Sequence, residues 1–167
     1  MATRVRKPVD SIERIRTGYF VLLMIMVAQF LLGMSVNLFV TIPTSHPGAN
    51  PPEYFGGVAD SVTWAVVHGP GLLQAHAALG LLLVLFSVNA LAQAIQVRTR
   101  RVILPASLGA LGIAGAGFNG GSFLNYNQDF SSMLMAAFFA LAVVAYITGI
   151  YVLPRNPSAS EPVKSPA

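Results

Sequence analysis

The sequence predicts an all-α integral membrane protein, folded as a four-helix bundle with both chain ends on the cytoplasmic side. Three observations support this. Hydrophobic residues make up 54% of the 167 residues and charged residues only 10%, whereas an ordinary soluble domain is about 25% charged. The apolar residues gather in four segments, each long enough to cross about 30 Å of hydrocarbon. Finally, all Lys and Arg residues fall on one side of those four segments.

The predicted spans divide the chain into three regions. Residues 17–153 form the membrane domain, and residues 1–16 form a cytoplasmic tail that includes the start of an interfacial helix. Residues 154–167 are rich in Pro and Ser with almost no apolar content, so we expect a disordered cytoplasmic tail. The first apolar segment is too long for a signal peptide and no small-residue cleavage site follows it, so it should stay attached. The spans are 17–42, 71–97, 102–123 and 130–153.

The basic residues predict the orientation of the bundle. All ten Lys and Arg residues lie in the N-terminal tail, in the link between the second and third spans, or in the C-terminal tail. The loops on the opposite side contain no Lys or Arg, and their only charged residues are Glu53, Asp60 and Asp129. Because basic residues are enriched on the cytoplasmic side, both termini should lie there, in a multi-pass protein of the cell membrane. Basic residues placed beside apolar spans also argue against nucleic-acid binding.

The loop between the first two spans is expected to be ordered on the non-cytoplasmic side. Its first part is rich in Pro and Gly, whereas apolar residues recur on one helical face from 58 to 66. This pattern predicts a short surface helix capped by Asp60 or Ser61. We expect a lid or anchor without chemistry. The alternative is that this loop and the loop before the fourth span form a polar pocket above His76. In that second loop, Asp129 or the Ser131–Ser132 pair is the expected cap of the fourth span.

The third predicted span is rich in small residues, which membrane helices use for close packing. We expect it to be the central helix of the bundle. The alternative is an interface with a second copy or with another membrane protein. Gly117 and Gly121 form a GxxxG pair within it. Its glycines are Gly109, Gly112, Gly115, Gly117, Gly120 and Gly121.

Polar residues inside the spans should face the bundle, because hydrocarbon offers them no hydrogen bonds. In the first span, Gln29, Gly33 and Asn37 recur every four residues. In the second span, four polar residues share an arc of about 100°. They are Gln74, Asn89, Gln93 and Gln96. We interpret both stripes as interhelical hydrogen bonding, with a wet or ligand-binding cavity as the alternative.

His76, inside the second span, is the main candidate for a binding residue. Gly80 lies one turn further and should leave room beside the imidazole, while His68 stands at the entrance of the span. The first hypothesis is that His76 only hydrogen-bonds within the bundle, to Asn37 or Asn119. The second is a b-type haem with His76 as an axial ligand, although no other span contains a histidine. The third is proton coupling or binding of a quinone-like ligand.

No pattern in the sequence predicts an enzyme. Cysteine is absent, which excludes thiol chemistry and disulfides. Paired carboxylates, a nucleophile elbow and a phosphate-binding glycine loop are also missing. His46, His68, Glu53 and Asp60 match no metal-ligand spacing. We therefore expect a non-enzymatic membrane subunit or partner-binding module, with a redox protein that uses His76 as the alternative.

Overall fold

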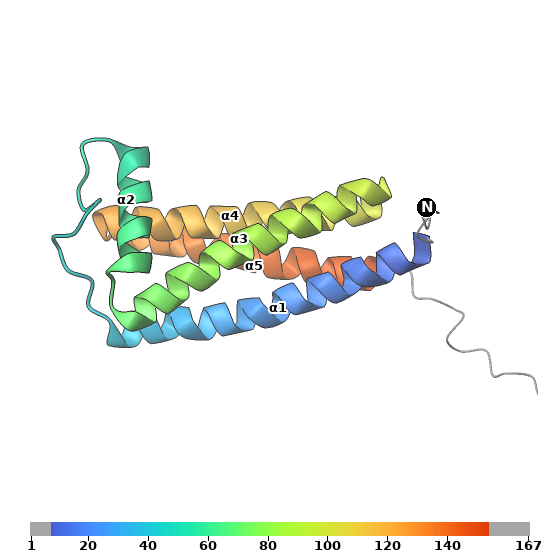
Figure 1. Ribbon diagram of the computed structural model, residues 1–167, viewed down its shortest axis with the longest axis horizontal. Coiled ribbons are helices and arrows are strands. Elements are labelled where there is room, and N and C mark those ends of the chain that lie inside the picture. The colour runs from blue at the N-terminus through green and yellow to red at the C-terminus, as the bar shows by residue number, and fades with distance from the viewer. Residues whose placement is uncertain (1–7, 154–167) are drawn as a thin grey trace, which may run out of the picture.

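The structure is a computed structural model that describes residues 8–153, with side chains from residue 11 onward. It contains five α-helices and no strands over that range (Figure 1). The predicted disordered tail at 154–167 lies outside the described residues, as do residues 1–7. The helices are α1 Pro8–Phe39, α2 Tyr54–Val67, α3 Gly71–Val97, α4 Arg100–Tyr126 and α5 Asp129–Val152.

Four of these helices, α1, α3, α4 and α5, are long and apolar enough to cross a membrane. The predicted all-α bundle with four helices able to span a membrane is thereby confirmed, and their apolar surfaces suit contact with a lipid bilayer. The predicted second span, 71–97, has the bounds of α3. The predicted first span is wrong at its end, because α1 stops at Phe39 and residues 40–42 are not helical. The chain then leads toward Pro43, which disfavours helix in the residue before it.

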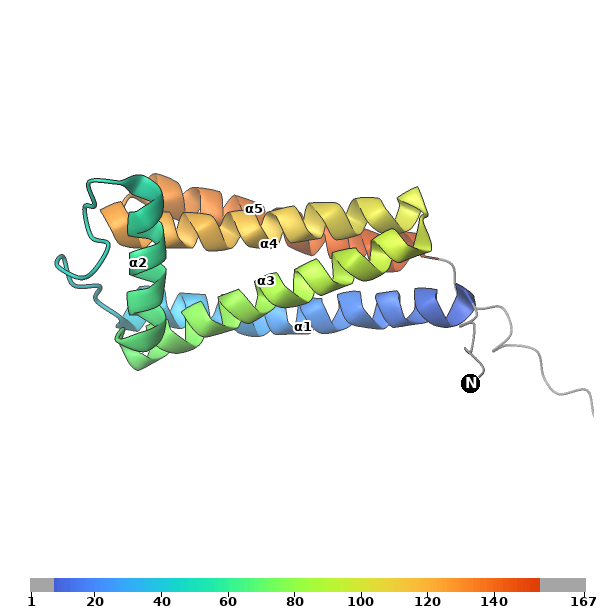
Figure 2. The same ribbon diagram turned by 45° about the horizontal axis from the view of Figure 1, so that its top comes forward.

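The four long helices form a ring in the order α1, α3, α4, α5, each packed against its two neighbours. The short helix α2 lies across one end of the ring, against α3 and α4 (Figure 1). We call this end the cap end; it comprises α2, residues 40–53 and the turn at 127–128. The other, basic end carries Arg14, Arg16 and the arginines around the α3–α4 turn. Figure 2 shows α3 running diagonally, from beside α1 at the cap end to beside α4 at the basic end.

Helix α2 begins because Glu53 caps it. The Glu53 carboxylate accepts hydrogen bonds from the backbone N–H groups of Phe55 and Gly56. These bonds, that of Gly56 first, lower the pKa of the Glu53 carboxyl below its ordinary value. The predicted cap at Asp60 or Ser61 is wrong, because both residues lie inside the helix. The apolar pattern marked the middle of α2 and not its start.

The start of α5 also differs from the prediction. Gln128 is the N-cap residue and makes no side-chain capping bond, while Asp129 lies in the first turn. The preceding residue, Asn127, ends α4 in the left-handed conformation with φ 50°. Asn tolerates this conformation better than most residues, so it allows the tight turn between α4 and α5.

The core is built from large side chains that lie over glycines of the facing helix. The Tyr146 ring lies against Gly109, and the Phe138 ring lies against Gly115, both between α4 and α5. The predicted close packing around the glycine-rich helix is therefore present. Helix α4 is the most buried of the four long helices and packs against α5, α3 and α2, as its expected central position requires, but within residues 8–153 it does not contact α1. In a ring of four helices, α1 lies diagonally opposite α4.

The α4–α5 contact can be tested at Gly112. A Cβ atom added there would lie 2.7 Å from the Phe138 carbonyl oxygen and 2.8 Å from the Ala142 Cβ. Neither backbone can move freely, so we expect Gly112→Ala to lower the free energy of unfolding by about 1–3 kcal/mol. The matched control is Gly117→Ala on the same helix, where the nearest atom would be 4.0 Å away. Circular dichroism during unfolding in mixed detergent micelles measures both, and equal stabilities would contradict the proposed packing.

Candidate functional site

His76 lies in the interface between α1 and α3, which run antiparallel. Its imidazole packs over Gly33, where an added Cβ would lie 2.9 Å from the His76 Cε1. The Gln29 amide nitrogen lies 3.4 Å from the His76 Nε2 and donates to the His76 carbonyl oxygen at 3.1 Å. The predicted partners Asn37 and Asn119 are therefore wrong. Asn37 is exposed, and the Asn119 amide donates to a carbonyl of its own helix.

The two helices make room for each other's polar side chains. Gly33 on α1 accommodates His76, and Gly80 on α3 accommodates Gln29, whose amide nitrogen would lie 3.3 Å from a Cβ at Gly80. Gly80 thus has a role at this site, but beside Gln29 and not beside the imidazole as expected. We call His76 and Gln29 the His–Gln pair.

The His–Gln pair keeps unused hydrogen-bonding capacity. The His76 Nδ1 and the Gln29 Oε1 are buried and have no hydrogen-bond partner among the described residues. Such atoms are costly inside a membrane, where water cannot easily reach them. The pair therefore favours a bound water or another polar group at this point.

The other histidines lie elsewhere at the cap end. His68 is the C-cap residue of α2 and is exposed. His46 stacks on Trp64, with ring centroids 4.2 Å apart. In the described part of the chain, no three His, Cys, Asp or Glu residues gather closely enough to hold a metal ion.

The polar stripe predicted on the second span does not face the bundle. Asn89 and Gln96 are exposed, and the Gln74 amide donates to the Val67 carbonyl at the cap end. Because α3 leaves α1 toward the basic end (Figure 2), the face that carries Asn89 and Gln93 is left open there.

That face lines a groove of about 600 Å³ between α1 and α3, which we call the α1–α3 groove. Gly18 lies along it with no atom within 4 Å of an added Cβ. The lining residues are polar near the basic end and apolar toward the middle of the bundle. The lining residues are Glu13, Arg14, Thr17, Gly18, Val21, Leu22, Ile25, Phe86, Asn89, Ala90 and Gln93.

Asn125 holds the cap onto α4, a role that the sequence analysis missed. It is only 2% exposed, and its side-chain amide lies 2.7 Å from the Ser61 hydroxyl. With the amide nitrogen facing the Gly57 carbonyl at 2.9 Å, the amide oxygen accepts the Val58 N–H at 3.1 Å. The Asn125 backbone carbonyl accepts from Asn50 at 2.9 Å. Ser61 on the apolar face of α2 was the available signal, because a buried hydroxyl needs a partner.

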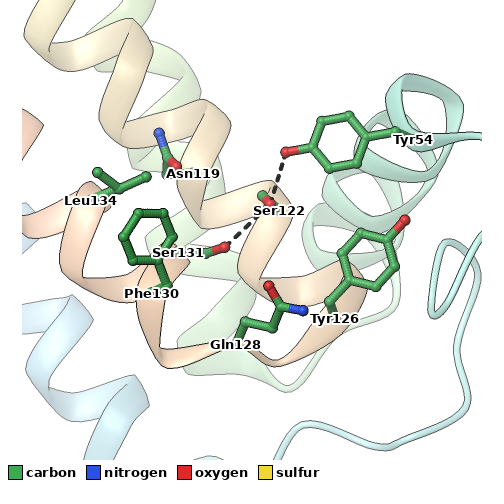
Figure 3. A pocket seen from close by; sticks show the side chains of 8 residues that line it. All are labelled: Tyr54, Asn119, Ser122, Tyr126, Gln128, Phe130, Ser131 and Leu134. Carbon is green, nitrogen blue, oxygen red and sulfur yellow. Dashed lines mark hydrogen bonds between the residues drawn. The ribbon is translucent and has the colours of Figure 1, made fainter.

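A second hollow, the cap pocket, lies between α2, α4 and α5 (Figure 3). The Tyr54 hydroxyl donates to the Ser122 hydroxyl at 2.9 Å, which lies 3.3 Å from the Ser131 hydroxyl. Both outer loops border this polar pocket, as the alternative interpretation of those loops expected, but His76 is not among its lining residues. These are Tyr54, Asn119, Ser122, Tyr126, Gln128, Phe130, Ser131 and Leu134.

The fold and these sites define the class of the molecule: a four-helix bundle whose long helices could span a membrane, with a helical cap at one end. Comparison with protein-family models, curated proteins and solved structures finds no match. Its function must therefore be argued from its own residues.

The His–Gln pair can be tested with Gln29→Leu. The substitution removes the hydrogen bonds to His76 within the membrane, each worth about 0.6 kcal/mol on average. We expect the free energy of unfolding in micelles to fall by about 1 kcal/mol. Gln96→Leu, at an exposed position of α3, is the control and should leave stability unchanged. A Gln29→Leu protein as stable as the unsubstituted one would show that the pair does not hold α1 to α3.

Proposed function

We propose that the protein is a non-enzymatic membrane subunit that binds a transmembrane helix of another chain in the α1–α3 groove. The observation that supports this most directly is the pair of amides that line the groove, Asn89, which is exposed, and Gln93, which is half-buried. The Gln93 amide donates to the Asn89 side chain at 3.3 Å, and the other hydrogen-bonding atoms of the two amides have no partner within the described residues.

The depth of Asn89 makes its exposure unfavourable. Helix α3 has 27 residues, so it is about 40 Å long against a hydrocarbon core of about 30 Å. Asn89 lies eight residues before Val97, about 12 Å from the end of the helix, and so inside the hydrocarbon when α3 is centred. An amide there is stabilised by a partner that hydrogen-bonds, and a polar residue of another helix is the usual one.

The glycine-rich helix supports this choice of surface. Gly112 is covered by α5, and Gly121, one member of the GxxxG pair, is covered by Val58 and Val62 of α2, whereas Gly117, the other member, is exposed. We therefore place the interface in the α1–α3 groove and not on the GxxxG pair. No Asp, Glu, Lys or Arg occurs in the four predicted spans, which argues for a binding role over ion transport.

Photocrosslinking in the native membrane tests the proposal, because the chain has no cysteine and single cysteines can carry a benzophenone. Phe86→Cys places the label in the groove, and Leu104→Cys, at a residue that is 61% exposed on α4, is the control. We expect a protein adduct from Phe86→Cys alone, reduced several-fold when Asn89→Leu and Gln93→Leu are added. An adduct of twice the chain mass identifies a second copy as the partner.

Two results would overturn the proposal. One is equal crosslinking at both labelled positions, which means nonspecific collision. The other is crosslinking to lipid alone from Phe86→Cys, which assigns the groove to a lipid.

We also propose that both termini are cytoplasmic, as the basic residues predict. Support comes from the grouping of Arg14, Arg16 and Arg98–Arg101 at one end of the bundle, while the cap end has no Lys or Arg. A reporter enzyme active only outside the cytoplasm should be inactive when fused after Ala167. The same reporter inserted at Ser45 should be active. An active reporter after Ala167 together with an inactive one at Ser45 would show the opposite orientation.

The second candidate is a b-type haem protein, or a proton- or quinone-coupled redox protein, that uses His76. The unpaired His76 Nδ1 favours it, because an imidazole nitrogen without a partner is available to a metal or a proton. His68, the other histidine of the predicted site, is exposed at the cap end. If protein purified with added haem shows a Soret band that His76→Ala abolishes, the haem proposal replaces the subunit proposal. Absence of the band would reject haem binding.

A further inference from the structure

We infer that the cap pocket binds a neutral polyhydroxyl ring, the chemistry of a sugar, either free or as the headgroup of a glycolipid. The pocket lies at the cap end, where α2 and the ends of α4 and α5 meet (Figure 3). It is separate from the α1–α3 groove and from the His–Gln pair, so this inference does not depend on the proposed function.

The charge of the pocket selects a neutral ligand. None of its eight lining residues carries a formal charge at neutral pH. An ionised phosphate, carboxylate or ammonium group entering it would lose water without gaining an opposite charge, which is unfavourable. Hydroxyl and amide groups remain as the recognition elements.

The pocket offers hydrogen-bond donors and acceptors that the chain itself does not use. The Gln128 side chain makes no capping bond to α5, and Figure 3 shows its amide between Ser131 and Tyr126. Asn119 uses only its amide nitrogen, on the Gly115 carbonyl, so its side-chain oxygen is available. A sugar hydroxyl both donates and accepts, so it can pair with either kind of group.

Aromatic rings supply the apolar part of the site. Tyr54 and Tyr126 stack nearly parallel, with centroids 6.1 Å apart and an interplanar angle of 9°. Phe130 stands on the other side of the pocket in Figure 3. Rings of this kind present flat, apolar surfaces with polar groups at their edges. The C–H face of a sugar ring matches such a surface while its hydroxyls reach the amides.

The walls are held in place before any ligand arrives. Tyr54, Ser122 and Ser131 form a chain of hydroxyl contacts across the three helices. Asn125, one turn from Ser122, fixes α2 to α4. Such preorganisation reduces the ordering cost of binding. The volume of about 290 Å³ is at the lower end for small-molecule sites, about 300 Å³, and suits a single ring.

Saturation-transfer NMR tests the inference with the full chain in a detergent that has no sugar headgroup, since a maltoside detergent would itself present the ligand. The probes are methyl glucoside and maltose, with N-acetylglycinamide as a neutral amide of similar size. We expect transfer to the sugar C–H protons, with affinity about tenfold weaker in Gln128→Leu and in Tyr126→Leu. Tyr151→Leu, at an 88% exposed residue near the far end of α5, is the control and should bind normally. Circular dichroism confirms that each variant is folded.

A second arm separates the two sources of the ring. The chain is placed in nanodiscs with and without a glucosyl diacylglycerol, and crosslinking to that lipid is measured from a benzophenone at Leu134→Cys. Binding of the glycolipid without the free sugars identifies the headgroup as the ligand. The inference is overturned if neither binds, if Tyr126→Leu and Gln128→Leu bind sugar as well as the unsubstituted chain, or if only N-acetylglycinamide binds.

Discussion

The packing of this bundle depends on large side chains that lie over glycines of the facing helix. Lipid is as apolar as the side chains, so burial alone does not drive membrane helices together, and close contact has to do so. Tyr146 on Gly109, Tyr19 on Gly149 and His76 on Gly33 are three such contacts, made between three different pairs of helices. Each brings two backbones near enough for extensive dispersion contact, which is individually weak and collectively large. The aromatic pair Tyr19 and Tyr146, 5.1 Å apart, links two of these contacts in the core.

The distribution of these contacts also explains where the molecule is open. On α1 and α3 they occur toward the cap end, at Gly33 and Gly80. Toward the basic end α3 turns to α4, and Gly18 of α1 has no neighbour within 4 Å of an added Cβ. The α1–α3 groove is thus a consequence of helix slant. The Asn89 side chain is exposed there and that of Gln93 is half-buried, because α1 is too far away to cover them fully.

The two ends of the bundle differ in chemistry as well as in shape. The basic end has arginines and an open groove between helices. The cap end has no Lys or Arg, and a short helix is fastened across it by Asn125 and started by Glu53. The α1–α3 groove and the cap pocket share no residues, so the helix partner proposed for the groove and the ligand proposed for the pocket can be bound at the same time.

The sequence by itself determined the number of long apolar helices and the bounds of α3, because apolar length is a property of consecutive residues. It also indicated that the glycine-rich segment from Gly109 to Gly121 would pack closely and that His76 would be held inside the bundle, but it did not indicate Gly149. Only the tertiary structure decided that Gln29 is the partner of His76, that Asn37 and Asn89 are exposed, and that Asn125 holds the cap. The helical period orders the side chains around one helix, but it does not say which neighbour each face meets. That depends on how α3 crosses between α1 and α4, and this crossing is set by contacts between residues far apart in the chain.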